Sequence, residues 1–131
     1  MAVNIMFTGS WIYNELSGQL RQYDLSLPQH NVLSILKGQY PNPCTLGLIQ
    51  ERMLDRESNA TRLVDKLLQK GLVNRCQCPE NRRKVDIVIT PAGLALLEKT
   101  AALIDNIQSR YETLTPEEAI LLDTLLDKLR A

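Results

Sequence analysis

The chain has 131 residues, of which 44% are hydrophobic, 23% charged and 5% aromatic, and its formal net charge is zero. This length suits one domain and leaves no room for a separate catalytic module. The apolar residues are mostly Leu, Ile, Val and Ala, which favours a helical core over an all-β sandwich. No apolar run approaches the roughly 20 residues that a membrane span needs, so we expect no membrane partner.

The N-terminus and the cysteines indicate where the protein resides. The segment 1–13 holds neither Lys nor Arg and lacks a continuous apolar stretch, unlike a secretory signal peptide. The chain has three cysteines, Cys44, Cys76 and Cys78. An odd number in a chain without a secretion signal argues against a disulfide framework. We therefore expect a cytoplasmic protein.

The first third of the chain predicts two helices. Residues 11–23 show helical spacing of apolar residues, although Gly18 weakens it. Ser26 and Gln29 then form the sequence pattern of a capping box, in which each side chain bonds the other's backbone N–H. The helix that follows should end before Pro41. Its predicted buried residues are Val32, Leu33, Ile35 and Leu36.

Two further helices and a tight turn occupy the middle of the chain. Thr45 is a predicted N-cap for a short helix over 46–53. After a polar turn over 54–57, the segment 59–70 predicts an amphipathic helix that ends at Gly71. Two short helices joined by a tight turn are typical of a helix-turn-helix.

A β-hairpin is predicted directly after these helices. The segments 72–78 and 84–90 are strand-like, and apolar residues alternate with others in the second. Residues 79–83, Pro-Glu-Asn-Arg-Arg, are expected at the hairpin tip. A hairpin appended to a helix-turn-helix is a wing.

The C-terminal part predicts two more helices. Thr90 and Pro91 begin a long one, whose predicted apolar face is Leu94, Leu97, Ala101, Ile104, Gln108 and Tyr111. A second capping box over 115–118 begins the last helix. That helix is apolar on more than one face, through Ile120, Leu121, Leu122, Leu125, Leu126 and Leu129. A small wing domain could not cover it, so it needs a partner surface, most simply a second copy of the chain.

The charges are unevenly distributed along the chain. The segment 58–84 holds seven basic and two acidic residues, a net charge of +5, and the remainder carries −5. One basic block on an otherwise acidic chain is the electrostatic signature of a protein that binds a polyanion.

The segment 25–97 resembles the MarR family of bacterial regulators in the order of its motifs. These are Leu25-Ser26 with Gln29, Thr45-Leu46, Ser58-Asn59-Ala60-Thr61-Arg62-Leu63-Val64-Asp65-Lys66-Leu67, Lys70-Gly71-Leu72-Val73-Asn74-Arg75, Pro79-Glu80-Asn81-Arg82-Arg83 and Ile89-Thr90-Pro91-Ala92-Gly93. The resemblance implies a mostly α-helical chain with a small β-hairpin wing (α+β). It divides the single domain 1–131 into a winged helix-turn-helix over 25–90 and dimerisation helices over 1–24 and 91–131.

The resemblance also implies a function. We expect a homodimer that binds a pseudo-palindromic operator in double-stranded DNA, with a recognition helix in the major groove and the wing at the minor groove. Such a protein is a transcription regulator and not an enzyme. Repression is expected, because nothing beyond the dimer and the reading head remains to recruit polymerase. The sequence shows no cofactor motif and no catalytic constellation.

Specific residues are expected at this DNA interface. In the recognition helix they are Asn59, Thr61, Arg62 and Lys66, since Asn suits adenine and Arg suits guanine. Ser58 is predicted as the helix cap, with its backbone at a phosphate. Arg75 either contacts phosphate or pairs with Asp65 or Glu80. In the wing the expected residues are Asn81, Arg82, Arg83 and Lys84.

Two positions depart from the family pattern. Asn81 stands where the family commonly has an Asp that orients the wing arginine, so Arg82 is expected to be held less firmly. The segment before the second helix is short, which suggests a reduced N-terminal dimer interface.

The sequence leaves two alternative functions and one additional site open. The zero net charge and Asn81 favour a winged-helix protein–protein interaction module without DNA binding. Cys76 and Cys78 lie two apart on a strand and favour a thiol-based redox sensor, although two thiols make an incomplete metal site. The family resemblance also implies a small-molecule effector, for which a pocket of Trp11, Tyr23, His30 and Tyr40 is a hypothesis.

Overall fold

The computed structural model describes residues 1–78, 81–111 and 113–131, and for residues 77–78, 81–84, 108 and 111 it describes the backbone alone. The elements in chain order are α1 (Ala2–Leu20), a 3-10 turn η1 (Arg21–Tyr23), α2 (Leu27–Gln39), β1 (Cys44–Thr45), α3 (Leu46–Arg52), α4 (Ala60–Gln69), β2 (Val73–Cys78), β3 (Asn81–Ile89), α5 (Pro91–Gln108), a 3-10 turn η2 (Ser109–Tyr111) and α6 (Pro116–Arg130).

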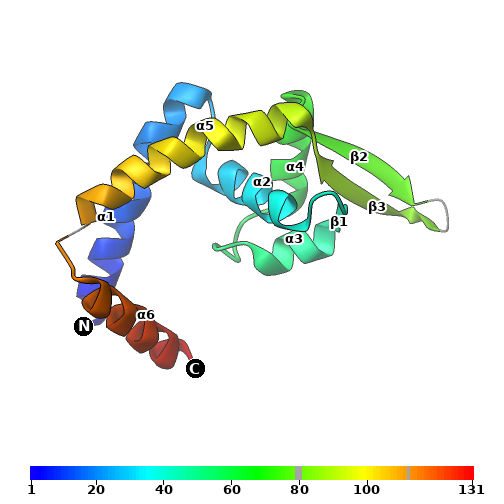
Figure 1. The fold of residues 1–131 in the computed structure, drawn as a ribbon. Helices are drawn as coiled ribbons and strands as arrows, with labels where there is room; N and C mark the ends of the chain where they lie inside the picture. The colour runs from blue at the N-terminus through cyan, green and yellow to red at the C-terminus, as the bar shows by residue number, and fades with distance from the viewer. Residues whose placement is uncertain (79–80, 112) are drawn as a thin grey trace.

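Figure 1 shows α2, α3, α4 and the three strands near the start of the long helix α5 and α6 beyond its other end. Helix α1 begins near α6, crosses α5 and ends beside α2, where its Leu20 joins the core. This arrangement matches the predicted fold class, a mostly helical chain with a small hairpin. None of the described helices is long and apolar enough to cross a membrane.

Both predicted capping boxes are present. The Ser26 hydroxyl accepts a hydrogen bond from the Gln29 backbone N–H at 3.2 Å, and the Gln29 side chain accepts one from the Ser26 N–H. Thr115 and Glu118 make the same reciprocal pair at the start of α6. These bonds satisfy N–H groups that a helix start leaves without an intrahelical partner. The hydrogen bonds also hold the pKa of the Glu118 carboxyl below its ordinary value.

The sheet contains a strand that the sequence pattern did not predict. Its order is β1-β3-β2, and all pairs are antiparallel. Cys44 of β1 pairs with Ile87, and Val73 of β2 pairs with Ile89. A two-residue strand is too short to show alternation, and β1 also runs directly into the Thr45 cap of α3. The sheet therefore links the start of α3 to the hairpin.

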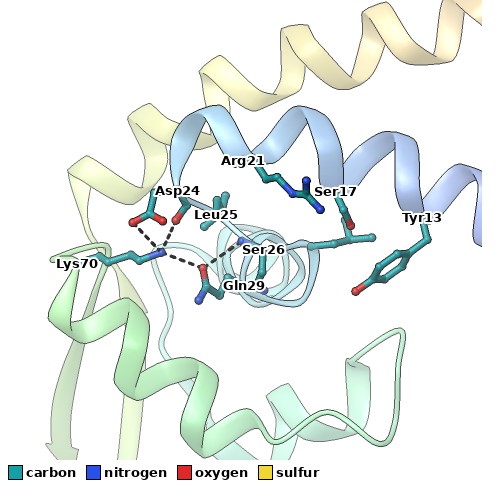
Figure 2. Close-up of a pocket in the computed structure, with 9 residues that line it drawn as sticks. Tyr13, Ser17, Arg21, Asp24, Leu25, Ser26, Gln29 and Lys70 are labelled. Carbon is teal, nitrogen blue, oxygen red and sulfur yellow. Dashed lines mark hydrogen bonds and ion pairs between the residues drawn. The ribbon is translucent and has the colours of Figure 1, made fainter.

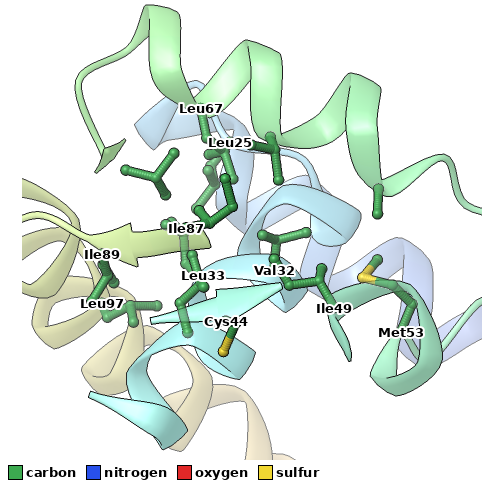
Figure 3. Packing of buried hydrophobic residues seen from close by; sticks show 14 of the residues in the cluster. Leu25, Val32, Leu33, Cys44, Ile49, Met53, Leu67, Ile87, Ile89 and Leu97 are labelled. Atoms are coloured by element: carbon green, nitrogen blue, oxygen red, sulfur yellow. The ribbon is translucent and has the colours of Figure 1, made fainter. Parts of the chain in front are cut away.

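The hydrophobic core lies between the sheet and the helices α2, α3 and α4 (Figure 3). Leu33, Ile49 and Ile87 are fully buried there, and Val64 and Leu67 of α4 pack into the same cluster. Burial of apolar surface of this kind contributes roughly 25 cal/mol per Å². The core thus fixes how α4 is seated on the rest of the domain.

The N-terminal helix and the long C-terminal helix differ in detail from the predictions. Helix α1 begins at Ala2 and not near Trp11, so the N-terminal segment is a full 19-residue helix and not a short one. On α5, Thr100 and Ile107 are buried and Ala101 is exposed. The predicted face is confirmed at the buried Leu97 and the half-buried Leu94 and Ile104, and it is wrong at Ala101. Thr100 was missed because a buried Thr carries no apolar signal, and the side chains of Gln108 and Tyr111 lie outside the described residues.

Candidate nucleic-acid interface

Helix α4 begins at Ala60, and Asn59 is its N-cap. The Asn59 Oδ1 accepts a hydrogen bond from the Arg62 backbone N–H at 3.1 Å. The prediction that Ser58 caps this helix is therefore wrong, and Asn59 lies just before the first turn and not in it. Both residue types are good caps, and the sequence alone could not distinguish their registers.

The other end of α4 is closed as predicted. Gly71 has φ +72°, a left-handed conformation that glycine adopts without steric cost. The Gly71 N–H donates to the Leu68 carbonyl and the Leu72 N–H to the Leu67 carbonyl, both at 3.0 Å. This pair of bonds is the Schellman arrangement, and it directs the chain straight into β2.

The two faces of α4 differ in character. Ala60, Val64 and Leu67 are buried in the core. Thr61, Arg62 and Lys66 are exposed, and Arg62 and Lys66 lie one turn apart on the same side of the helix. The helix therefore presents a polar, basic face to solvent and packs against the core with its apolar face.

Arg75 of β2 forms an ion pair with α4. Its Nη2 lies 2.7 Å from the Asp65 Oδ1, and both side chains are about half exposed. Of the partners that the sequence suggested, Asp65 is the one contacted in the structure, and Glu80 lies outside the described residues. The pair links the hairpin to the recognition-helix candidate and neutralises the Arg75 charge.

Lys70, another cation of the basic block, is bound at the surface by groups of its own chain (Figure 2). Its Nζ donates to the Gln29 Oε1 at 3.0 Å and to the Asp24 carbonyl oxygen, and it lies 3.8 Å from the Asp24 Oδ2. Gln29 is nearly fully buried, and its Oε1 also serves the capping box of α2. Lys70 therefore ties the end of α4 to the junction between α1 and α2.

The wing residues are placed by backbone only. Asn81, Arg82, Arg83 and Lys84 belong to β3, which begins at Asn81 and pairs that residue with Cys78. The prediction of a hairpin tip over 79–83 was too long at its end, because 81–83 are already strand. Their side chains, and residues 79–80, lie outside the described part of the chain, so their DNA contacts stay predictions.

The cysteines occupy different environments. Cys76 is exposed on β2, and the Cys78 side chain lies outside the described residues, so the redox hypothesis for this pair stays a prediction. Cys44 is a buried residue of β1. Burial, more than the nearby charge of Asp86, raises the pKa of the Cys44 thiol, while Arg52 opposes that shift.

The four residues of the hypothetical effector pocket are spread along the fold. Trp11 lies on α1, Tyr23 in η1, His30 on α2, and Tyr40 at the far end of α2. Five cavities described in the structure are lined by other residues. His30 Nε2 lies 3.1 Å from the Thr100 Oγ1 of α5, and burial lowers the pKa of the imidazole. The ring therefore connects α2 to α5, and the effector pocket stays a prediction.

Two residues near α4 make contacts that sequence reasoning did not predict. Gln50 of α3 bonds to the backbone on both sides of Asn59, and Gln29, expected only as a cap, also binds Lys70. A polar residue on an otherwise apolar helix face was the available signal for Gln50. Nothing in the local pattern could have indicated its partners.

The helix pair α3–α4 followed by the β2–β3 hairpin defines a winged helix-turn-helix protein. The MarR family model matches residues 25–85. The uncharacterized HTH-type transcriptional regulator YdgG of Bacillus subtilis is 33% identical over 108 residues, which are 79% of this chain and 68% of that protein. The chain belongs to the MarR family of transcription regulators.

Two further comparisons agree with this assignment. The multiple antibiotic resistance protein MarR of Escherichia coli is 29% identical over 117 residues, which are 87% of this chain and 79% of that protein. The crystal structure of an S. aureus MepR–DNA complex shares the fold with a TM-score of 0.88 at 20% identity, over 98% of this chain and 95% of that one.

Proposed function

We propose that this regulator binds a pseudo-palindromic operator in double-stranded DNA as a homodimer and represses transcription, with α4 in the major groove and the β2–β3 hairpin at the minor groove. The observation that carries the proposal is the exposed face of α4, where Thr61, Arg62 and Lys66 stand opposite a fully buried apolar face. A helix of this kind fits the major groove, and its N-terminal residues reach base edges.

The residues divide into two roles. Asn59, Thr61 and Arg62 surround the start of α4 and are proposed to read bases. Lys66, one turn later, is proposed to contact phosphate, as are the wing cations Arg82, Arg83 and Lys84. Ser58 stands next to the helix start. Its backbone N–H, which the sequence suggested for a phosphate, already donates to the Asp55 carbonyl oxygen at 3.1 Å, so its hydroxyl is the proposed phosphate contact. The S. aureus MepR protein, which shares the fold, was solved as a DNA complex.

The exposed surface supports a homodimer. The chain exposes 9327 Å². A monomer of this mass is expected to expose about 7,000 Å². The excess is about 2,300 Å² per protomer, or about 4,600 Å² for two protomers, and the total buried at obligate dimer interfaces is about 2,000–5,000 Å². Large exposed apolar residues concentrate on the two terminal helices: Val3, Met6 and Phe7 on α1, and Ile120, Leu121, Leu125 and Leu129 on α6.

We assign no catalytic step to the protein. The protein is proposed to act on gene expression by occupying DNA, and it is therefore expected with the chromosome in the cytoplasm. The homodimer brings two α4 helices to one operator, and half-sites about one helical turn apart, roughly 34–36 Å, follow from that symmetry.

Selection of binding sites from a random duplex library, followed by fluorescence anisotropy, tests the function. Arg62→Ala is expected to relax base preference and to weaken operator binding by at least about 30-fold, because each of the two half-sites loses a bidentate base contact worth roughly 1–3 kcal/mol. Arg130→Ala, at the distant end of α6, removes the same charge and serves as the matched control. No salt-dependent binding of any duplex by the unmodified protein, or unchanged operator affinity for Arg62→Ala, would refute the assignment of α4.

A further inference from the structure

The turn between α3 and α4, residues 53–59, is spanned by one side chain. Gln50 Nε2 donates to the Ser58 carbonyl oxygen at 2.7 Å and to the Arg56 carbonyl oxygen at 3.4 Å. The Gln50 Oε1 accepts from the Ala60 N–H at 3.0 Å. The amide group therefore contacts the backbone immediately before and immediately after the Asn59 cap.

These bonds use the particular chemistry of a primary amide. Ala60 is the first residue of α4, so its N–H has no partner within the helix. The Ser58 carbonyl likewise lies outside the helix. One group must donate to the carbonyl and accept from the N–H at the same time. Glutamine does so without taking up a proton, whereas a glutamate of the same length would accept only unless it were protonated.

Core packing and Gln50 fix different parts of α4. Val64 and Leu67 are fully buried and set where the helix lies on the domain. The first turn is held less firmly by the core, because Ala60 offers it only a methyl group and Leu63 is half-buried against it. The cap and Gln50 supply the hydrogen bonds that fix this turn. Of the proposed base-reading residues, Thr61 and Arg62 belong to this first turn and Asn59 is its cap. Base readout tolerates displacements of only about 0.5 Å in a binding constellation.

We propose that Gln50 is a positioning residue for sequence-specific recognition, because its amide holds the first turn of α4 at the angle that base readout requires. This role rests on the proposed DNA-binding function. It concerns the discrimination between operator and random DNA, whereas the electrostatic affinity for any duplex depends on the cations alone.

Gln50→Met tests the role, since methionine has a similar volume and offers no such hydrogen bonds. Gln69→Met is the matched control, because Gln69 is exposed at the end of α4 and the structure describes no side-chain hydrogen bond for it. The dissociation constants for the selected operator and for random duplex are measured at several salt concentrations, together with the thermal midpoint and the particle mass.

For Gln50→Met we expect about tenfold weaker operator binding, with random-duplex affinity and the salt slope unchanged. Gln69→Met should bind both as the unmodified protein does. Unchanged operator affinity, or an equal loss for operator and random DNA, overturns the role. If the unmodified protein binds no duplex at all, the proposed function itself fails, which is a distinct result.

Amide hydrogen exchange provides a readout that does not depend on DNA. The Ala60 amide should exchange faster in Gln50→Met while the Val64 amide keeps its protection, because only the first turn loses an anchor. Equal acceleration at both amides would indicate a general loss of stability and overturn the positioning role. If Gln50→Met does not fold, Gln50→Asn, one methylene shorter, is expected to show the same split between operator and random DNA.

Discussion

Gly93, in the first turn of α5, lies where the helix passes close to the hairpin. A Cβ added there would lie 2.4 Å from the Leu72 carbonyl oxygen and 2.6 Å from the Ile89 Cγ1. The Leu72 carbonyl already accepts the Thr90 N–H at 3.1 Å, and Ile89 is buried. Neither neighbour can move without disturbing another contact, so Gly93→Ala should be strained.

The size of the effect follows from two opposing contributions. Alanine favours a helix over glycine by about 1 kcal/mol. Overpacking of a filled site costs typically about 1–3 kcal/mol and sometimes more, and a backbone oxygen at this distance belongs to the upper end. We expect Gly93→Ala to lower the free energy of unfolding by about 2 kcal/mol, or the thermal midpoint by about 8 °C.

Urea unfolding at fixed protein concentration measures this difference, because the stability of a dimer depends on concentration. Gly38→Ala is the control: its added Cβ would meet nothing within 4 Å, and Gly38 is exposed in the last turn of α2. That variant should be as stable as the unmodified protein or more stable, by up to about 1 kcal/mol. A Gly93→Ala variant that equals or exceeds Gly38→Ala in stability would refute the packing argument.

Three other predictions concern assembly, pH and salt. Leu125→Glu places a charge on the half-exposed apolar face of α6 and should reduce the particle mass measured by light scattering from dimer to monomer; an unchanged mass would exclude this face from the interface. Burial lowers the pKa of His30, so its neutral form contributes stability that is fully present above the unfolded pKa of about 6.5 and is lost as the pH falls below it. The urea midpoint of the unmodified protein should therefore fall between about pH 7.5 and about pH 5.5, and that of His30→Gln should fall less; an equal fall in both would contradict this. Lys66→Ala should reduce the slope of log affinity against log salt concentration by about 2 per dimer. Arg75→Ala should leave that slope unchanged, because Asp65 already neutralises Arg75; equal slopes for both variants would contradict the assignment of Lys66 to a phosphate.

Most helices and the hairpin could be predicted because their signals are local. Ser26 with Gln29 and Thr115 with Glu118 marked helix starts through residues three positions apart. Gly71 marked a helix end through its conformational freedom. In each case the partners lie within a few residues of each other, so the sequence contains the whole interaction.

The features that sequence reasoning missed depend on partners far apart in the chain. Strand β1 forms only because β3, some 40 residues later, supplies the pairing partner for Cys44. The α5 face is set by how the helix lies on α2, where His30 meets Thr100. Asn59 and Ser58 are equally good caps by residue type. In the structure Asn59 is the cap, and Gln50 of α3 binds the backbone on both sides of it. Tertiary contacts decide each of these features, and the periodicity of the sequence carries no information about such contacts.

The contacts of the Lys70 ammonium group have an evolutionary consequence. The group binds oxygens of both Asp24 and Gln29, and the Gln29 Oε1 also accepts the Ser26 N–H in the capping box of α2. Substitutions at positions 24, 29 and 70 are therefore expected to be non-additive, since the loss of any one partner leaves the others incompletely satisfied. A lineage that replaces Lys70 should accumulate compensating changes at the other two positions, although both lie more than 40 residues away along the chain.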